Sequence, residues 1–341
     1  MKKMTSACAS LALLTTTLAP GLAKAETWSF TVGWPPGHFM VKNGVEPWMQ
    51  CVDDATDGEI EFNLFPSGQI SGEPGIPDAL KGGLANVGYI GIHAMSDKMP
   101  LTMLTMLPGI GDSAVQISSA IRDVLIEDGG AIHDQVIEYG LQPMLATAFP
   151  PYQLGLAGDP VTTMENLSGL KIRTSGGSLV LAMQALNAVP VQLPASDAYV
   201  AMQQGTVDGY VLAPPSITSY KLEELSGSVS RNFNIASTTG FFAMDKQRFD
   251  SLSEDLQATL LKCGKDVEAA LAAKADGEVE SLLASFEEQG INIYSFSDEE
   301  VAKIKKTIQP VTDDLVKRIS DQGLDAQEAL DEFMAAIEKH K

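Results

Sequence analysis

One arginine is placed where it could bind an acidic ligand. Arg173 ends the alternating stretch "LKIR" and is followed by the loop "TSGGS", whose glycines can let a ligand approach the backbone. The segment from Leu167 to Tyr210 is typical of strand, loop, helix, strand, helix, strand. Open α/β sheets bind ligands in crevices outside the carboxyl ends of their strands. Arg173 lies at such an end and is the first candidate for a ligand contact.

Aromatic residues follow two strands predicted near the N-terminus. Trp34 follows the strand 27–33 in the loop "WPPGHF", and Tyr89 and His93 lie at or just past the strand Val87–Gly91. If these strands are parallel, both loops open onto one edge of the sheet. A tryptophan before two prolines is held out of the sheet, so we expect Trp34 to line a cleft. His93 fits a cleft or a structural hydrogen bond equally well.

Alternating and helical patterns predict an α/β fold of two lobes. A strand at 27–33, a helix at Val45–Thr56 and a strand at Glu59–Phe65 form a βαβ opening. The chain has 341 residues, more than one core usually organises. It changes lobes at Pro150-Pro151 and returns over Phe233–Met244. We expect lobe I to hold residues 26–150 and 239–278, and lobe II to hold residues 151–238 and 279–341.

A long helix is predicted from Glu254 to Gln289. Ser253 is a suitable N-cap and Gly290 a suitable stop. At 1.5 Å per residue it would be roughly 50 Å long, more than one lobe needs. Gly264 and Gly277 are places where it could bend or break.

The first 25 residues carry the pattern of an export signal. Lys2 and Lys3 form a basic start, Ala9–Leu18 is a short apolar run, and Ala23-Lys24-Ala25 matches the small-x-small cleavage pattern. No later window supplies about 20 consecutive apolar residues. We expect a soluble periplasmic protein that begins at Glu26 after removal of the signal peptide, residues 1–25.

The net charge of −21 makes nucleic acid a poor partner. A solvated acidic surface or an acidic patch for a cationic partner would both explain it. Cys51 and Cys263 remain once Cys8 is removed with the leader, and they are either bridged or two free buried thiols. No zinc-type cluster surrounds them. The four histidines, His38, His93, His133 and His340, never pair at metal-ligand spacing, so we expect no metal and no cofactor.

Several segments in a fixed order resemble one family. They are "FPSGQI", "LSGLKIRTSGG", "VPVQLPASDAYVAMQQGTVDG", "SLSEDLQATLL" and the long helix. Together they resemble the DctP-like solute-binding proteins of tripartite ATP-independent periplasmic (TRAP) transporters. The resemblance implies two α/β lobes joined by crossing strands, with the long helix spanning both. It also implies a monomer that closes on a ligand, delivers it to a TRAP permease in the membrane, and grips the ligand carboxylate with Arg173.

The chain departs from the best-known members of this family. Gln153 stands where sialic-acid binders have a second arginine, and Ala195 and Ala213 replace their phenylalanine and asparagine. Tyr210 and Val211 stand where metal-using relatives have an acidic residue and a tryptophan. These differences argue against sialic acid and against a bound metal.

The candidate ligand contacts are one cation surrounded by aromatic and neutral polar residues. They are Arg173, Gln153, Trp34, Tyr89, His93, Tyr152, Tyr210 and Phe241. One permanent cation suits a small monoanion with an apolar body, or a small acid whose hydroxyls meet amide and phenol groups. A sulfonate, or a quaternary ammonium in an aromatic box, stays open.

An exported enzyme is the competing class of protein. The chain has no Gly-x-Ser-x-Gly elbow, no paired histidines, no Ser-x-x-Lys and no phosphate-binding glycine loop. Asp208, within "TVDG", fits a turn better than a catalytic acid. We therefore predict a binding protein for a small organic anion that feeds a permease, and a sensor component that presents its ligand is the remaining alternative.

Overall fold

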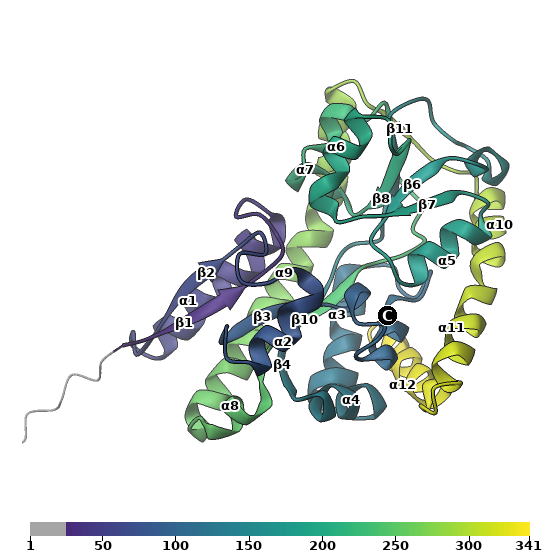
Figure 1. Cartoon of the computed structure of the whole chain (residues 1–341). Helices are drawn as coiled ribbons and strands as arrows, with labels where there is room; N and C mark the ends of the chain where they lie inside the picture. Colours follow the sequence, from purple (N-terminus) through teal and green to yellow (C-terminus); the bar gives the residue numbers. More distant parts are fainter. Residues whose placement is uncertain (1–24) are drawn as a thin grey trace, which may run out of the picture.

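The computed structural model describes residues 25–341, so the expected signal peptide lies outside this range except for Ala25. The described chain forms two β-sheets with helices packed around them, and α9 (Glu254–Glu288) runs along both parts (Figure 1). This is the two-lobed α/β architecture that the sequence predicts.

The first sheet has five strands among the described residues, in the order β2-β1-β3-β10-β4. β1 (Glu26–Thr31) pairs in parallel with β2 (Ile60–Phe65) and β3 (Val87–Gly91). β10 (Thr239–Asp245) is antiparallel to β3 and to β4 (Leu141–Ala148). β1, β2 and β3 therefore end at one edge of the sheet, and β3 has the predicted bounds.

The second sheet contains the segment that carries Arg173. Its order is β11-β9-β5-β8-β6-β7 within residues 25–341. β6 (Lys171–Thr174) pairs in parallel with β7 (Val189–Gln192) and β8 (Gly209–Leu212), as the pattern of 167–210 predicts. The other three strands are β5 (Gln153–Leu156), β9 (Ser228–Ser230) and β11 (Asn292–Tyr294).

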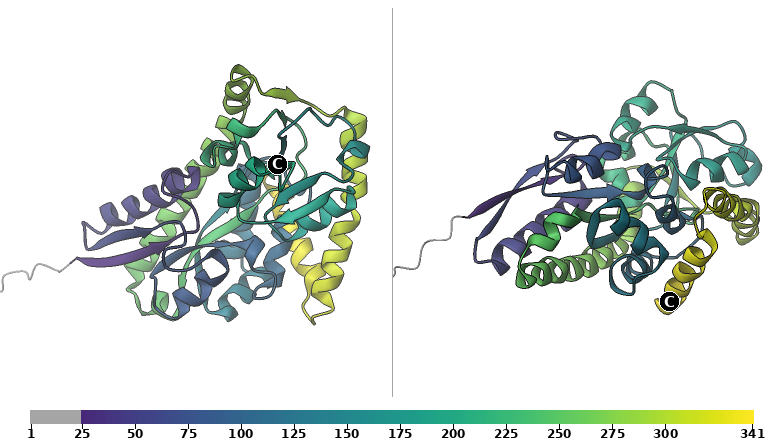
Figure 2. Two further views of the ribbon diagram at one scale, coloured as in Figure 1. Left: turned by 45° about the horizontal axis from the view of Figure 1, so that its top comes forward. Right: turned by 60° about the horizontal axis from the view of Figure 1, so that its bottom comes forward.

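Helices cover both sheets (Figure 2). The α-helices besides α9 are α1 (Glu46–Ala55), α2 (Ile76–Lys81), α3 (Ala114–Arg122), α4 (Ala131–Tyr139), α5 (Ser178–Ala185), α6 (Ala198–Gln203), α7 (Pro214–Ser219), α8 (Lys246–Ser251), α10 (Asp298–Ile308), α11 (Pro310–Ser320) and α12 (Ala326–Lys339). α10 packs against α5, whereas α12 packs against α3 beside the first sheet. Residues 279–341 thus contact helices beside both sheets. The lobe boundaries stay a prediction.

Two short segments connect the sheets and pair with each other. The chain leaves β4 through Phe149 and enters β5 after Tyr152, and it returns between β9 and β10. Phe149 N–H donates to Thr238 O at 3.0 Å, and Tyr152 N–H donates to Ala236 O at 2.8 Å. The crossing segments predicted from the sequence therefore form a hydrogen-bonded pair between the sheets.

Helix α9 is continuous, so neither of its glycines breaks it. The Ser253 hydroxyl accepts the N–H of Leu256 at the start of the helix. A Cβ atom at Gly264 would lie 1.9 Å from the carbonyl oxygen of Met144 in β4. Gly264 is thus a point of close approach between helix and sheet rather than a bend, and Gly277 has open space around it.

A disulfide joins Cys51 of α1 to Cys263 of α9. Their Cα atoms are 5.8 Å apart and 212 positions apart in sequence. From the sequence alone, Cys51 and Cys263 could be either bridged or two free thiols. In the structure they are bridged. It ties the first helix of the fold to the long helix.

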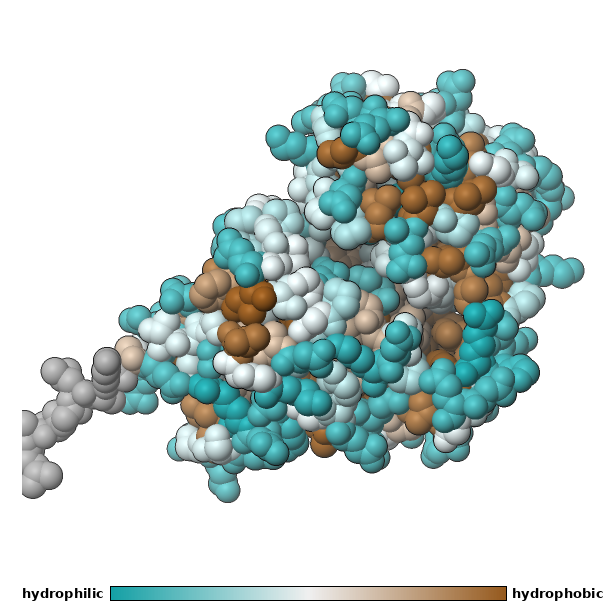
Figure 3. Space-filling view, viewed as in Figure 1, coloured by the Kyte–Doolittle hydropathy of each residue, from teal (hydrophilic) through white to brown (hydrophobic). Residues whose placement is uncertain are grey.

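The face of the molecule shown in Figure 3 is mostly hydrophilic, with hydrophobic residues in small groups and a hollow between its upper and lower parts. None of the helices within residues 25–341 is both long enough and apolar enough to cross a membrane.

Candidate functional site

A cavity of about 740 Å³ lies between the two sheets. Loops that follow β1, β2 and β3 form one side, and loops that follow β6, β7 and β8 form the other. The carboxyl ends of the parallel strands of both sheets therefore face one space, which is where α/β folds bind ligands. The side chains used below are Trp34, His38, Glu73, Tyr89, His93, Phe149, Tyr152, Arg173, Ser175 and Tyr220.

Arg173 is a buried cation without an ion-pair partner in the described part of the chain. Its side chain is 2% exposed, and Nε donates to the carbonyl oxygen of Leu193 at 3.0 Å. No acidic group within residues 25–341 forms an ion pair with it, and Nη1 is buried without a hydrogen-bond partner. Burial lowers the pKa of the guanidinium, and Tyr152, Tyr220 and Glu73 oppose that shift. A buried charge in this state is costly until an anion pairs with it.

The loop after β6 adds a second hydrogen-bond donor to the cavity lining. Ser175 lines the cavity, and its hydroxyl is buried without a partner among the described residues. Gly176 and Gly177 follow with φ of +114° and +62°, which is the left-handed region that glycine adopts most readily. The glycines of "TSGGS" let the chain turn sharply into α5 and leave the Ser175 hydroxyl at the cavity wall.

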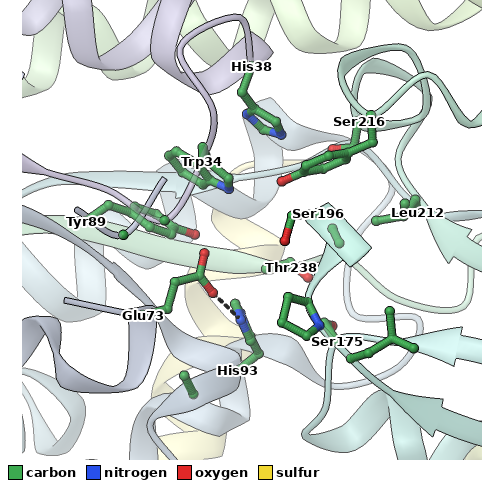
Figure 4. Close-up of a pocket in the computed structure, with 18 of the residues that line it drawn as sticks. Trp34, His38, Glu73, Tyr89, His93, Ser175, Ser196, Leu212, Ser216 and Thr238 are labelled. Atoms are coloured by element: carbon green, nitrogen blue, oxygen red, sulfur yellow. Dashed lines mark hydrogen bonds and ion pairs between the residues drawn. The ribbon is translucent and has the colours of Figure 1, made fainter. Parts of the chain in front are cut away.

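Glu73 and His93 are hydrogen-bonded to each other on the opposite side of the cavity. His93 Nε2 lies 2.9 Å from Glu73 Oε2 (Figure 4). Burial raises the pKa of Glu73, but the hydrogen bond to His93 and the electrostatic effects of His93 and Arg173 outweigh burial, so the net shift of the pKa is downward. The cavity therefore holds an ionised carboxylate as well as a guanidinium.

Aromatic rings form much of the remaining wall. The Trp34 ring lies 4.0 Å from that of Tyr89 and stacks on His38 at 5.1 Å between centroids. His38 in turn lies 5.1 Å from Tyr220, which follows α7 on the other side. Burial lowers the pKa of His38 to about 3, so this histidine is neutral and adds no positive charge. Phe149 lies edge-on to Trp34 at 6.3 Å.

Five of the eight predicted contacts line the cavity, namely Trp34, Tyr89, His93, Tyr152 and Arg173. Burial raises the pKa of the Tyr152 hydroxyl to about 12, so it stays protonated at neutral pH. Their contact with a ligand stays a prediction.

The other three predicted contacts lie outside the cavity lining. The Gln153 carbonyl oxygen accepts from Ser230 and from Phe233 N–H, and its amide donates to Asn234. The Tyr210 ring lies over Gly155, and its hydroxyl is 2.8 Å from that of Ser226. Phe241 is buried in an apolar cluster beside the first sheet. Each side chain is used for internal packing or hydrogen bonding, so we do not propose them as ligand contacts.

Four further charged or aromatic lining residues, His38, Glu73, Phe149 and Tyr220, were not predicted from the sequence. Glu73 lies in the loop "SGEPG", His38 and Phe149 lie in proline-containing loops, and Tyr220 follows α7. A signal existed for Glu73, because it follows the carboxyl end of β2 as His93 follows that of β3. For Tyr220 no local pattern pointed to the cavity. Within residues 25–341 no cluster of three or more histidine, cysteine or acidic side chains is arranged to hold a metal ion.

Comparison with known proteins places the chain in a family. Residues 30–318 match the family model described as "Bacterial extracellular solute-binding protein, family 7", named DctP. The outer membrane transporter protein TsaT of Comamonas testosteroni is 23% identical over 307 residues, 88% of each chain. The sialic acid-binding periplasmic protein SiaP of Vibrio cholerae is 21% identical over 285 residues, 83% of this chain and 87% of SiaP.

Solved structures share the fold. A marine metagenome TRAP solute-binding protein specific for aromatic acid ligands, in complex with 3-hydroxybenzoate, superimposes with a TM-score of 0.85 at 21% identity and covers 93% of this chain and 99% of its own. A TRAP solute-binding protein from Rhodoferax ferrireducens with copurified benzoate gives 0.83 at 22% identity, with 93% and 98% covered. The family model spans most of the chain, and the chain therefore belongs to family 7 of the bacterial extracellular solute-binding proteins.

Proposed function

We propose that this protein is a periplasmic receptor that binds a small organic acid with one carboxylate and an aromatic or apolar body, and passes it to a TRAP permease. Family 7 consists of solute receptors rather than enzymes, so a bound ligand is released unchanged. The receptor role follows from the family, and the ligand class from the cavity.

The buried, unpaired guanidinium of Arg173 carries the proposal. Arg173 lines the cavity and its Nη1 has no hydrogen-bond partner among the described residues, and Ser175, whose hydroxyl is also unpartnered there, lines the same cavity. A carboxylate accepts two parallel N–H bonds from a guanidinium, and such a bond is stronger where water is excluded. Arg173 is also the one permanent cation among the described residues that line the cavity, so a second acid group on the ligand would lack a partner.

The aromatic wall indicates the body of the ligand. Trp34, Tyr89, Phe149, Tyr152 and Tyr220 offer flat apolar surface around the cavity. Aromatic rings pack well in offset or edge-on contact with such surfaces. The relatives solved with 3-hydroxybenzoate and benzoate, and one from Bordetella bronchiseptica with mandelate, support an aromatic monoacid.

Closure of the two lobes would complete the site. The lining comes from both sides of the paired crossing segments, Phe149–Tyr152 and the return before β10. A ligand that touches both sides stabilises the closed arrangement, because its contacts are complete only there. We expect a monomer to suffice, with lobe I and lobe II bounded as the sequence predicts.

Isothermal titration and thermal shift with a panel of acids test this proposal. The panel holds benzoate, mandelate, succinate, benzenesulfonate and glycine betaine, and the proteins are the wild type, Arg173→Met and Lys171→Met. Lys171 is an exposed cation on the same strand, so its variant controls for the loss of one positive charge. We expect benzoate or mandelate to raise the melting temperature of the wild type and of Lys171→Met by mass action.

Arg173→Met should lose about 100-fold in affinity, because a charge-assisted pair in a buried site is lost. The proposal fails if no aromatic acid binds the wild type, or if Arg173→Met binds as tightly as the wild type. Stronger binding of succinate would identify a diacid receptor instead.

A further inference from the structure

We propose that Glu73, positioned by His93, is a second ligand contact, and that the preferred ligand is a hydroxylated aromatic acid whose hydroxyl donates to the free oxygen of Glu73. This inference rests on the proposed function, since it takes the ligand carboxylate to lie at Arg173. It narrows the ligand class from aromatic monoacids to those with a hydrogen-bond donor on the ring or side chain.

The Glu73 carboxylate has one oxygen engaged and one available. Oε2 lies 2.9 Å from His93 Nε2, and Oε1 makes no hydrogen bond with any residue in the described range. Figure 4 shows one carboxylate oxygen directed at His93 and the other turned toward the space between Tyr89, Trp34 and Ser196. His93 Nδ1 is also buried without a partner in residues 25–341. An ionised carboxylate only accepts hydrogen bonds, so the missing partner is a donor.

Two glycines make room for this pair. A Cβ atom at Gly33 would lie 2.5 Å from Glu73 Cγ and 2.6 Å from Oε1, and one at Gly91 would lie 2.7 Å from Cε1 of His93. Any side chain at either position would push the pair out of its place. The ends of β1 and β3 are thus built to let Glu73 and His93 lie against the backbone at the cavity wall.

The electrostatics of the cavity select a neutral donor. The charge of Arg173 helps to lower the pKa of Glu73, so the guanidinium and the carboxylate act on each other across the cavity. A second acid group near Glu73 would be repelled, and an ammonium group, although attracted by Glu73, would carry a larger desolvation cost than a hydroxyl. A hydroxyl avoids both costs and supplies the one proton that Oε1 lacks.

Titration calorimetry at pH 7.5 with matched ligands tests the inference. The ligands are benzoate, 3-hydroxybenzoate, 4-hydroxybenzoate, and the two methoxybenzoates, which keep the oxygen but cannot donate. The proteins are the wild type, Glu73→Ala, Glu73→Gln and Asp97→Asn. Asp97 is an exposed acid that follows His93 in the chain but does not line the cavity, so Asp97→Asn controls for loss of a negative charge.

We expect the wild type and Asp97→Asn to bind at least one hydroxybenzoate about 10- to 100-fold more tightly than benzoate and its methoxy analogue, as a hydrogen bond to a charged group allows. Glu73→Ala should reduce that preference to about threefold or less while it changes benzoate affinity by less than about threefold. Glu73→Gln keeps a neutral acceptor and should retain an intermediate preference.

Three outcomes would overturn the inference. If benzoate binds through Arg173 and the hydroxyl brings no gain, the receptor proposal stands and the role of Glu73 falls. If Glu73→Ala weakens benzoate and hydroxybenzoate equally, the Glu73–His93 pair holds the loops together and does not read the ligand. If no aromatic acid binds the wild type, the proposed function and this inference fall together.

Discussion

Replacement of Arg122 by methionine tests the ion pair that joins three elements beside the first sheet. Arg122 of α3 donates from Nε to Glu268 Oε1 at 2.9 Å and from Nη2 to Oε2 at 2.6 Å, and both side chains are buried. Oε2 also accepts the N–H of Ala146 in β4 at 2.7 Å. The pair thus connects α3, α9 and β4, and the variant leaves a buried carboxylate with one backbone donor.

The pKa of Glu268 sets the pH dependence of this contact. Burial raises it from 4.5 to about 7, although Arg122 and the Ala146 N–H lower it. A carboxyl with a higher pKa in the folded state contributes stability that is complete below pH 4.5 and is lost as the pH rises through about 7. At 1.36 kcal/mol per pKa unit, the wild type loses about 3 kcal/mol of unfolding free energy over that range.

In Arg122→Met the folded-state pKa of Glu268 rises further, because its strongest partner is gone. At pH 8 the carboxylate must be buried unpaired or take up a proton, and removal of one partner of a buried pair costs about 3–5 kcal/mol. At pH 5 Glu268 is protonated in both proteins, so we expect a smaller loss of about 1–2 kcal/mol.

Urea unfolding followed by circular dichroism at pH 5 and pH 8 measures both losses. The double variant Arg122→Met with Glu268→Gln is the control, because it has no titrating group at this place, so its own unfolding free energy should lack the fall between pH 5 and pH 8 that Glu268 causes in the wild type. An equal loss for Arg122→Met at the two pH values would refute the reasoning.

Two further predictions concern α9. Gly264→Ala should lower the unfolding free energy by about 3 kcal/mol or more, because its Cβ would lie 1.9 Å from Met144 O. Thermal unfolding measures the loss, and an unchanged melting temperature would contradict this close approach. Replacement of Cys51 and Cys263 by alanine opens a loop of 212 positions and should cost up to about 5 kcal/mol, with ligand affinity unchanged because neither cysteine lines the cavity. Non-reducing mass spectrometry and calorimetry check both parts, and a variant as stable as the wild type would argue against the bridge.

The sequence predicted the framework of the fold well because strong local patterns carry it. β3 has the predicted bounds, and α9 ends within one residue of its prediction, since its cap at Ser253 and its stop at Gly290 are local signals. The local alternation of "LKIR" likewise predicts a strand that ends near Arg173, and β6 ends at Thr174. Gly264 was misjudged because its role depends on Met144, more than a hundred residues away in sequence, and no local pattern shows that contact.

Strand periodicity explains why two of the predicted contacts do not line the cavity. Successive side chains of a strand point to opposite faces, so Tyr152 at the cavity implies that Gln153 points away from it. Tyr210 is in register with Arg173 on the neighbouring strand, but its ring lies over Gly155 of the next strand and reaches Ser226. Gly155 has no side chain, so it leaves room for the Tyr210 ring on the adjacent strand. The sequence alone does not show that these two strands are neighbours.

The burial of Arg173 links binding to closure. Within residues 25–341 the buried guanidinium keeps one hydrogen bond, to Leu193, and no ion pair, which raises the free energy of the protein without a ligand. An anion that pairs with it removes that cost, and removes more of it as water leaves the cavity, because the interaction strengthens in a lower dielectric. Closure is therefore favoured by an acid at Arg173 and much less by a neutral molecule of the same shape. Benzamide, which keeps the ring of benzoate but not its charge, should accordingly fail to stabilise the protein at concentrations where benzoate does.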